Sequence, residues 1–363
     1  MTGALQEFKC PCCGADVEFD SASQKMKCPY CGSEFEMESL KAYDDELAEN
    51  SEDHMEWKMG STDEWSDGEA DGMGVYSCQS CGGEVMADEN TAASFCPYCG
   101  NPVVMKGSIA GSLKPEFIIP FKLDKKAAVN KFAEHLKGKK LLPKVFKDQN
   151  HIEEIKGIYV PYWLFDTKAD AKMRYKATKV KCWSDSRYNY TKTSYYAVMK
   201  NGDITFEHVP VDGSSKMPDD LMESIEPFDF TQAVPFQSAY FSGYYADKYD
   251  MDENISANRA NERVRNATED RFMQSVTGYS SVIPDGGSIN LSGGKATYAM
   301  YPVWLLTTKW NDENYLFAMN GQTGKFVGNL PMDKGAFVRY LLATFGIVSA
   351  LLYIIMIIIW VIM

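Results

Sequence analysis

The chain has 363 residues, of which 45% are apolar and 13% aromatic, and its formal net charge is −13 at pH 7. This length accommodates two or three domains, and the aromatic content excludes a wholly disordered chain. The acidic excess lies in residues 34–72, which contain fifteen Asp and Glu against two Lys, so the remainder is neutral by formal count. The composition therefore predicts a folded protein with one very polar segment.

A cysteine motif occurs twice in the N-terminal third, with a constant offset of 68 residues and fourteen residues between its two CxxC pairs. A CxxC turn points two thiolates at one ion, and the glycine after each pair permits a left-handed backbone. Two such turns joined by a hairpin supply the four sulfurs that Zn²⁺ prefers. We predict two structural zinc ribbons, at 1–38 and 75–106, with the ligands Cys10, Cys13, Cys28, Cys31, Cys78, Cys81, Cys96 and Cys99.

A thiol redox protein is the weaker interpretation of these cysteines, although CPYC is also the active-site tetrapeptide of glutaredoxins. In that fold the dithiol opens a helix, which Gly32 and Gly100 would weaken, and it has no second CxxC at a fixed distance. Two cysteines lie outside the motif. Cys12 either points away from the first site or exchanges with Cys13, and Cys182 is expected to be a packed strand residue.

Nucleic-acid binding is the alternative function for a zinc-ribbon protein. The first ribbon has three Lys against five acidic residues, and the second has one Lys against three. Each four-thiolate zinc centre adds a further charge of about −2, whereas binding to phosphates requires clustered cations. The charge pattern therefore disfavours nucleic acid as a partner of the ribbons.

Residues 39–74 are predicted to form an acidic flexible linker, because their apolar surface is too small to offset the entropy of ordering them. Trp57 and Trp65 interrupt this segment. Acids interleaved with aromatic residues leave open a second interpretation, in which the segment docks on a basic groove.

Residues 107–335 are predicted to form an α+β body with mainly antiparallel sheet. A helix is expected after Asp124 as N-cap, and a second helix over 252–276. Hairpins are expected to turn at Asn201-Gly202 and Asn320-Gly321, with a further glycine turn in "GGSINLSGGKAT". The similar segments 161–164 and 302–305 suggest that the body contains two related units.

No catalytic constellation is found in the body. The four histidines are scattered, and the segment around Gly294-Lys295 lacks the first glycine and the Ser or Thr of a phosphate loop. We therefore predict that the protein is not an enzyme. The main basic cluster is predicted to contact anionic lipid, an acidic partner or the protein's own linker, and its members are Lys122, Lys125, Lys126, Lys137, Lys139, Lys140, Lys144 and Lys147.

The last 23 residues, 341–363, contain no charge and no proline. As a helix they extend roughly 34 Å, which is sufficient to cross a bilayer. Lys334 and Arg339 precede this span, so the positive-inside rule predicts a single-pass tail anchor at 336–363 in the cell membrane, with the bulk of the chain in the cytoplasm. The N-terminus lacks the pattern of a signal peptide.

Several further segments carry a family pattern: "IIPFKLDKKAA", "IEEIKGIYVPYWLFD", "VPVDGSSKMPDDLMESIEPFD", "YFSGYYADKYD" and "YPVWLL" before "NGQTGK". Together with the double CPxCG ribbon, they resemble bacterial membrane-anchored double zinc-ribbon proteins, labelled as TFIIB-type zinc-ribbon or primosomal helicase-like. The resemblance covers nearly the whole chain, but the chain has no Walker A or helicase box.

The resemblance implies protein partners, because some members are encoded beside phage-shock-protein-A-like and flotillin-like proteins. We expect a non-enzymatic, membrane-anchored zinc-binding scaffold or adaptor that docks protein partners at the cytoplasmic face of the membrane, in an envelope-stress complex.

Overall fold

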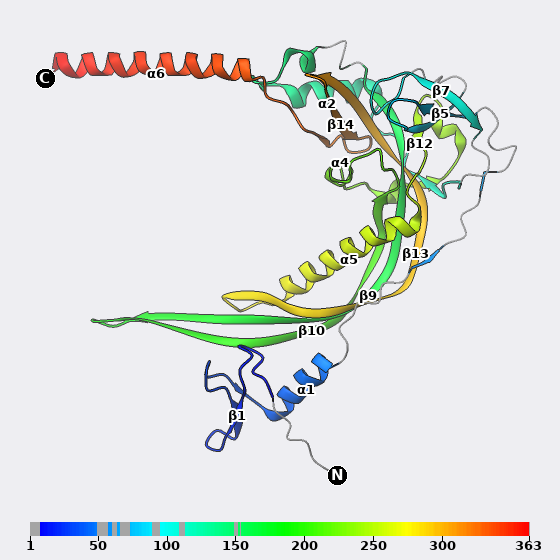
Figure 1. Cartoon of the computed structure of the whole chain (residues 1–363). Helices are drawn as coiled ribbons and strands as arrows, with labels where there is room; N and C mark the ends of the chain where they lie inside the picture. The colour runs from blue at the N-terminus through cyan, green and yellow to red at the C-terminus, as the bar shows by residue number, and fades with distance from the viewer. Residues whose placement is uncertain are drawn as a thin grey trace. The chain divides into compact units, whose positions relative to one another are not determined.

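The computed structural model describes residues 8–48, 57–59, 64–65, 73–88, 95–108, 113–148, 152 and 154–362 (Figure 1). The chain divides into two compact units. Unit 1 comprises Met1–Gly60, Leu164–Val211 and Asn254–Ala296, and unit 2 comprises Ser61–Trp163, Asp212–Glu253 and Thr297–Met363. Both units are therefore assembled from segments that are far apart in the sequence.

Unit 1 begins with a small three-stranded sheet that carries the first cysteine repeat. Its antiparallel strands are β1 (Glu18–Asp20), β2 (Lys25–Lys27) and β3 (Glu34–Phe35), and Glu18 lies opposite Lys27. The predicted hairpin between the two CxxC pairs is confirmed. Helix α1 (Met37–Ala48) follows β3, and its Leu40 completes a small core with Phe8 and Met26.

Helix α1 begins at the end of the predicted first ribbon and includes residues 39–48 of the segment that the sequence predicts to be a flexible linker. Leu40 is 1% exposed, and the Tyr43 hydroxyl lies 3.4 Å from Asp285 Oδ2, so these two apolar side chains order the start of the segment. The two tryptophans of the segment also have contacts, and Trp65 packs edge-on against Phe236. Trp57 donates a hydrogen bond of 2.7 Å to Asn261 and packs edge-on against Phe165. Residues 49–56, 60–63 and 66–72 of the predicted linker lie outside the described residues.

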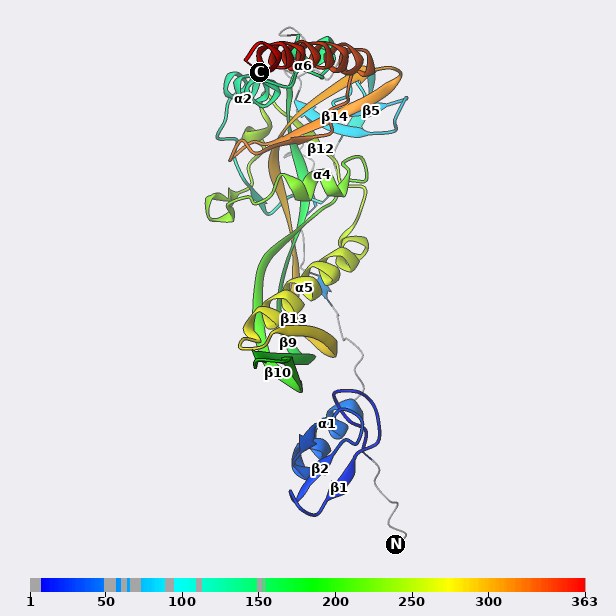
Figure 2. The same cartoon turned by 90° about the vertical axis from the view of Figure 1, so that its left-hand side faces the viewer.

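Long strands form the rest of unit 1. Strand β10 (Asn189–Asp212) pairs with β9 (Lys156–Ser184), which neighbours β13 (Ser281–Trp310), and β13 also pairs with β4 (Lys58–Met59). Helix α5 (Glu253–Ser275) confirms the second predicted helix. It packs along these strands (Figure 2), and its residues Val264 and Phe272 share a core with residues of β9 and β13.

The predicted turn at Asn201-Gly202 is wrong, because both residues lie inside strand β10. The hairpin turns instead at Asp185, whose carboxylate accepts hydrogen bonds from the backbone N–H groups of Arg187 and Tyr188 at 2.8 and 2.7 Å. Gly202 lies against α5, where a Cβ would make an ordinary van der Waals contact of 3.5 Å with the Phe272 ring. The glycine turn predicted in "GGSINLSGGKAT" is likewise wrong, because this segment belongs to β13.

Unit 2 is built on a sheet in the order β11-β8-β13-β9-β12-β6-β5-β7. The second cysteine repeat is continuous with this sheet, because β6 pairs with both β5 and β12. The strands not yet described are β5 (Met73–Cys78), β6 (Glu84–Asp88), β7 (Val103–Ser108), β8 (Phe117–Ile118), β11 (Val234–Pro235), β12 (Tyr245–Asp247), β14 (Glu313–Asn320) and β15 (Phe326–Gly328). The turn predicted at Asn320-Gly321 is confirmed between the antiparallel strands β14 and β15.

Helix α2 (Lys125–Leu136) begins at the predicted cap, where the Asp124 carboxylate accepts a 2.7 Å hydrogen bond from Ala127 N. Its Phe132 is fully buried against Phe317 of β14 and Phe326 of β15. Further helical segments in the described part of the chain are α4 (Asp219–Ser224) and the 3-10 helices η2 (Lys144–Lys147), η3 (Phe230–Gln232) and η4 (Ser238–Phe241).

Helix α6 (Lys334–Ile362) ends unit 2. Asp333 caps it by accepting a hydrogen bond from Ala336 N at 2.9 Å. The helix is long and apolar enough to span a membrane by length and composition, and its most apolar stretch is not buried in the structure. The described residues thus contain two four-cysteine clusters, an antiparallel-rich sheet body and one candidate membrane helix.

Candidate metal centres

The structure gathers the eight predicted ligand residues into two groups of four. In each group, all four Sγ atoms lie within 4.8 Å of one another. In the first, Cys10 Sγ lies 3.6 Å from Cys31 Sγ, and Cys13 Sγ lies 3.4 Å from Cys28 Sγ. A tetrahedral Zn²⁺ with Zn–S bonds of 2.3 Å separates its sulfurs by about 3.8 Å. The first cluster therefore fits a four-thiolate metal site.

The second cluster has the same dimensions. Cys78 Sγ lies 3.5 Å from Cys99 Sγ, and Cys81 Sγ lies 3.6 Å from Cys96 Sγ. In each of these two pairs, one cysteine is buried and the other is partly accessible. The donor set is four soft sulfurs in both clusters, which suits zinc and disfavours hard cations such as Mg²⁺ or Ca²⁺.

All four CxxC turns share one backbone pattern. In the last of them, Gly100 N donates to Cys96 O at 3.0 Å, and Cys96 N donates to Asn101 O at 2.7 Å. The glycine of every turn has a φ between +71° and +77°, which a residue with a Cβ rarely adopts. The requirement is conformational, since a Cβ at Gly14, Gly32 or Gly100 would meet no atom within 4 Å. The predicted left-handed glycines are thereby confirmed.

The thiols within a cluster influence one another's ionisation. Burial raises the pKa of Cys10 and of Cys96. Burial opposes ionisation of Cys31 as well, yet hydrogen bonds from Ser33 and from neighbouring thiols lower its pKa to about 6. Burial and the neighbouring thiols thus shift the pKa values of the sulfurs in opposite directions, and a bound cation would favour the thiolate form of all four.

The two copies of CPYCG differ in their surroundings. Tyr30 of the first copy is 85% exposed, whereas Tyr98 of the second is 8% exposed and lies beside the buried carboxylate of Asp247. The hydroxyl of Thr307, on β13, donates to the carbonyls of Pro97 and Tyr98 at 2.9 and 3.0 Å. The second repeat is therefore fixed to the body of unit 2, while the first exposes its tyrosine to solvent.

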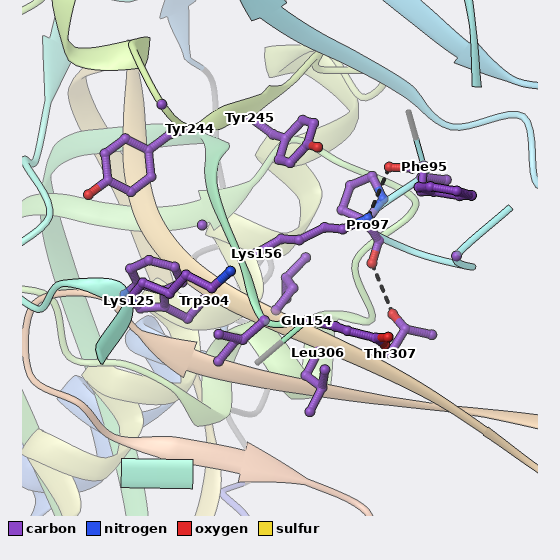
Figure 3. Close-up of a pocket in the computed structure, with 16 residues that line it drawn as sticks. Phe95, Pro97, Lys125, Glu154, Lys156, Tyr244, Tyr245, Trp304, Leu306 and Thr307 are labelled. Atoms are coloured by element: carbon purple, nitrogen blue, oxygen red, sulfur yellow. Dashed lines mark hydrogen bonds between the residues drawn. The ribbon is translucent and has the colours of Figure 1, made fainter. Parts of the chain in front are cut away.

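A cavity of about 770 Å³ lies beside the second cluster (Figure 3). The side chain of Lys156 extends along it toward the ribbon, and its Nζ donates to Phe95 O at 3.1 Å. Burial lowers the pKa of Lys156, while the nearby thiols of Cys96 and Cys99 favour its charged form. This lysine places a cation next to a cluster that would carry a charge of about −2 with zinc bound.

Lys156 and Thr307 support the second cluster but were not among the predicted site residues. They lie 61 and 210 residues from the ribbon atoms that they contact, and no spacing pattern links such positions. Cys12 is not a member of the first cluster, in which Cys13 takes part. Cys182 is exposed on β9, with its Sγ 3.6 Å from Thr191 Oγ1, and is not the packed residue that the sequence predicts.

Comparison with known proteins finds no matching family model and no matching solved structure. The chain is similar to YdjG of Bacillus subtilis (strain 168), a protein described as uncharacterized. The two are 31% identical over 232 residues, which make up 64% of this chain and 68% of YdjG. The chain therefore belongs to the same family as YdjG.

Proposed function

We propose that the protein is a membrane-anchored, zinc-binding scaffold that docks protein partners next to the membrane and catalyses no reaction. The observation that carries this proposal is the presence, in one chain, of two four-cysteine clusters and an apolar C-terminal helix. Each cluster would hold one structural Zn²⁺ through its four thiolates. Such ions typically contribute on the order of 10 kcal/mol to the folding of small modules.

Helix α6 would cross the cell membrane. Its 29 residues extend about 43 Å, which exceeds the roughly 30 Å thickness of the hydrocarbon core. Lys334 and Arg339 stand at its start, and this favours an orientation with the remaining chain in the cytoplasm. The resemblance to membrane-anchored double zinc-ribbon proteins supports the same arrangement.

The end of the β9–β10 hairpin offers a surface for a protein partner. Trp183 and Tyr190 stack there with ring centroids 5.4 Å apart, and Tyr188 contacts Tyr190 edge-on at 6.3 Å. Trp183 is 48% exposed and Tyr188 is 65% exposed. Exposed aromatic clusters are uncommon on surfaces that remain in water and are enriched at protein interfaces. We name these three residues the hairpin cluster.

The docking role is tested by affinity purification of the full-length chain from detergent-solubilised membranes. The variant Trp183→Ser/Tyr188→Ser removes most of the hairpin cluster. The variant Phe19→Ser/Tyr30→Ser removes two exposed aromatic side chains of the first ribbon and serves as the matched control. We expect the parent and the control to retain a stoichiometric partner that the hairpin variant loses.

The expected partners are a phage-shock-protein-A-like and a flotillin-like protein. If only the control variant lost the partner, the docking site would lie on the first ribbon and not at the hairpin cluster. A parent chain that retains no protein, but binds duplex DNA at moderate salt, would contradict the scaffold and support the nucleic-acid alternative.

A further inference from the structure

A basic groove lies at the end of helix α2 in unit 2. Its cavity measures about 350 Å³, and Leu136 and Ile152 form an apolar part of its wall. Both of these residues belong to the buried core of the unit, so the groove has a rigid base. Its cationic side chains are Lys137, Lys139, Lys140 and Lys147. We name these four residues the groove lysines.

The groove adjoins the start of helix α6. Asp333 N donates a hydrogen bond of 2.8 Å to Leu141 O, which joins the groove segment to the residue that caps α6. Lys140 Nζ lies 5.9 Å from the centroid of the Tyr340 ring, one residue before the apolar stretch that begins at Leu341. The groove therefore lies where the chain would enter a membrane.

The charge around the groove is strongly positive. Residues 121–150 contain nine Lys against three acidic residues. Among the described residues, carboxylates on or beside the elements that form the groove include Glu134 on α2, Asp148 after η2 and Glu154 after Ile152. Asp333, before α6, lies 3.9 Å from Arg339. Lys139 Nζ lies 2.8 Å from His135 Nε2, which restrains that lysine at the rim.

We infer that the groove binds the headgroup of an anionic phospholipid in the leaflet that α6 enters. The groove lysines would pair with the phosphate, and the apolar wall would contact the glycerol and the first acyl carbons. A lipid is favoured over other anions because α6 would hold the groove at the depth of the headgroups. This inference rests on the proposed membrane anchoring by α6 and names the lipid class that the groove beside this helix recognises.

The test is hydrogen exchange of the full-length chain in two kinds of nanodisc. One contains phosphatidylcholine alone, and the other contains phosphatidylcholine with about one-third phosphatidylglycerol. Each lysine close to an anionic surface strengthens the attraction by about fivefold. We expect exchange within residues 137–147 to slow by about fivefold or more in the anionic nanodiscs, and this protection to disappear at high salt.

The variant Lys137→Gln/Lys139→Gln/Lys140→Gln/Lys147→Gln should lose the protection. The matched control Lys41→Gln/Lys181→Gln/Lys192→Gln/Lys309→Gln makes the same change of charge at exposed lysines elsewhere and should keep it. In detergent, glycerol phosphate and inorganic phosphate should give no protection. Equal protection by these soluble anions would show a phosphate site that is not specific for lipid and would overturn the inference.

Insertion into the nanodisc is measured separately, by co-purification of the chain with the disc. A chain that inserts but exchanges equally in both lipid compositions would overturn the lipid inference and leave the anchoring intact. A chain that does not remain with either disc would overturn both.

Discussion

Among single residues, Lys156 has the most direct relation to the metal chemistry. Its Nζ holds the carbonyl of Phe95, the neighbour of Cys96. Groups that orient or balance the charge of metal ligands typically change metal affinity by 10- to 100-fold. We predict that Lys156→Met lowers the zinc affinity of the second cluster by about tenfold, as measured by competition with a chromogenic chelator.

Lys125→Met is the matched control, since Lys125 lines the same cavity from helix α2. It should leave both clusters unchanged. If Lys156→Met weakened the two clusters equally, or neither of them, Lys156 would not act as a counter-charge to the second cluster.

Asp247 predicts a pH dependence of stability. The residue is 1% exposed, and burial raises its pKa from 3.8 to about 7. The folded chain therefore holds this proton more tightly than the unfolded chain. The stability contribution of the group falls as pH rises from about 4 to 7 and is constant above that range.

Asp247→Asn should remove this slope. We expect the difference in free energy of unfolding, variant minus parent, to be about 1 kcal/mol larger at pH 8 than at pH 6. Denaturant melts of detergent-solubilised protein at both pH values measure the difference. Asp312→Asn, at an exposed carboxylate, should show no such increase. A pH-independent difference for Asp247→Asn would mean that this carboxyl group is already ionised at pH 6.

For single residues, the sequence predicts those backbone conformations that depend only on neighbouring residues in the chain. The left-handed glycines follow from the CxxC turn alone, and their φ values confirm them. Tyr30 and Tyr98 occupy identical pentapeptides, yet one is exposed and the other buried. The burial of Tyr98 depends on Asp247 of β12 and Thr307 of β13, which are distant in sequence, and no pentapeptide pattern contains that information.

Among the structural elements, the two ribbons differ in how they join their surroundings. The first has its own sheet of β1, β2 and β3, whereas β6 of the second pairs with β12 of the body. We predict that Cys28→Ser removes one zinc ion and increases hydrogen exchange in residues 8–48 alone. Cys96→Ser should also remove one zinc ion, but it should increase exchange in β12 as well.

Mass spectrometry of peptides after exchange makes this comparison, with the parent as reference. Unchanged exchange in β12 after Cys96→Ser would mean that the body holds the second ribbon in place without its metal.

Local signals predicted α2 and α5 because a capping aspartate and helical spacing act within a few residues. Asn201-Gly202 failed as a turn signal because strand β10 continues through both residues and lies against Phe272 of α5 there. Residues 37–48, which overlap the start of the predicted linker, form a helix because Leu40 is buried in the core of the first ribbon. In each of these failures, a contact distant in sequence outweighed a local preference.

In the whole molecule, β9 and β13 each contribute residues to both compact units. A prediction of domains from changes of composition along the chain, such as 107–335 for one body, assumes contiguous segments. Both strands change composition near the crossing, from apolar residues to alternating charged residues in β9 and from Gly- and Ser-rich to aromatic-rich in β13. Such a change within one continuous strand does not show which distant segments share a unit, so the division into units could not be derived from the sequence.

Truncation of the chain before helix α6 tests whether this helix anchors the protein in the membrane. A chain ending at Asp333 lacks α6 and should move from the membrane fraction to the soluble fraction while keeping its zinc. Membrane retention of this truncated chain after a high-salt wash would contradict anchoring by α6.

The eight clustered cysteines are proposed to bind two zinc ions. Native mass spectrometry of the full-length chain tests this proposal most directly, because one spectrum reports both bound metal and disulfide formation. We predict a mass that corresponds to two zinc ions and ten cysteines free of disulfides. A metal-free chain with a mass about 4 Da below that of the reduced polypeptide would indicate two disulfides, and it would replace the zinc account with thiol redox chemistry.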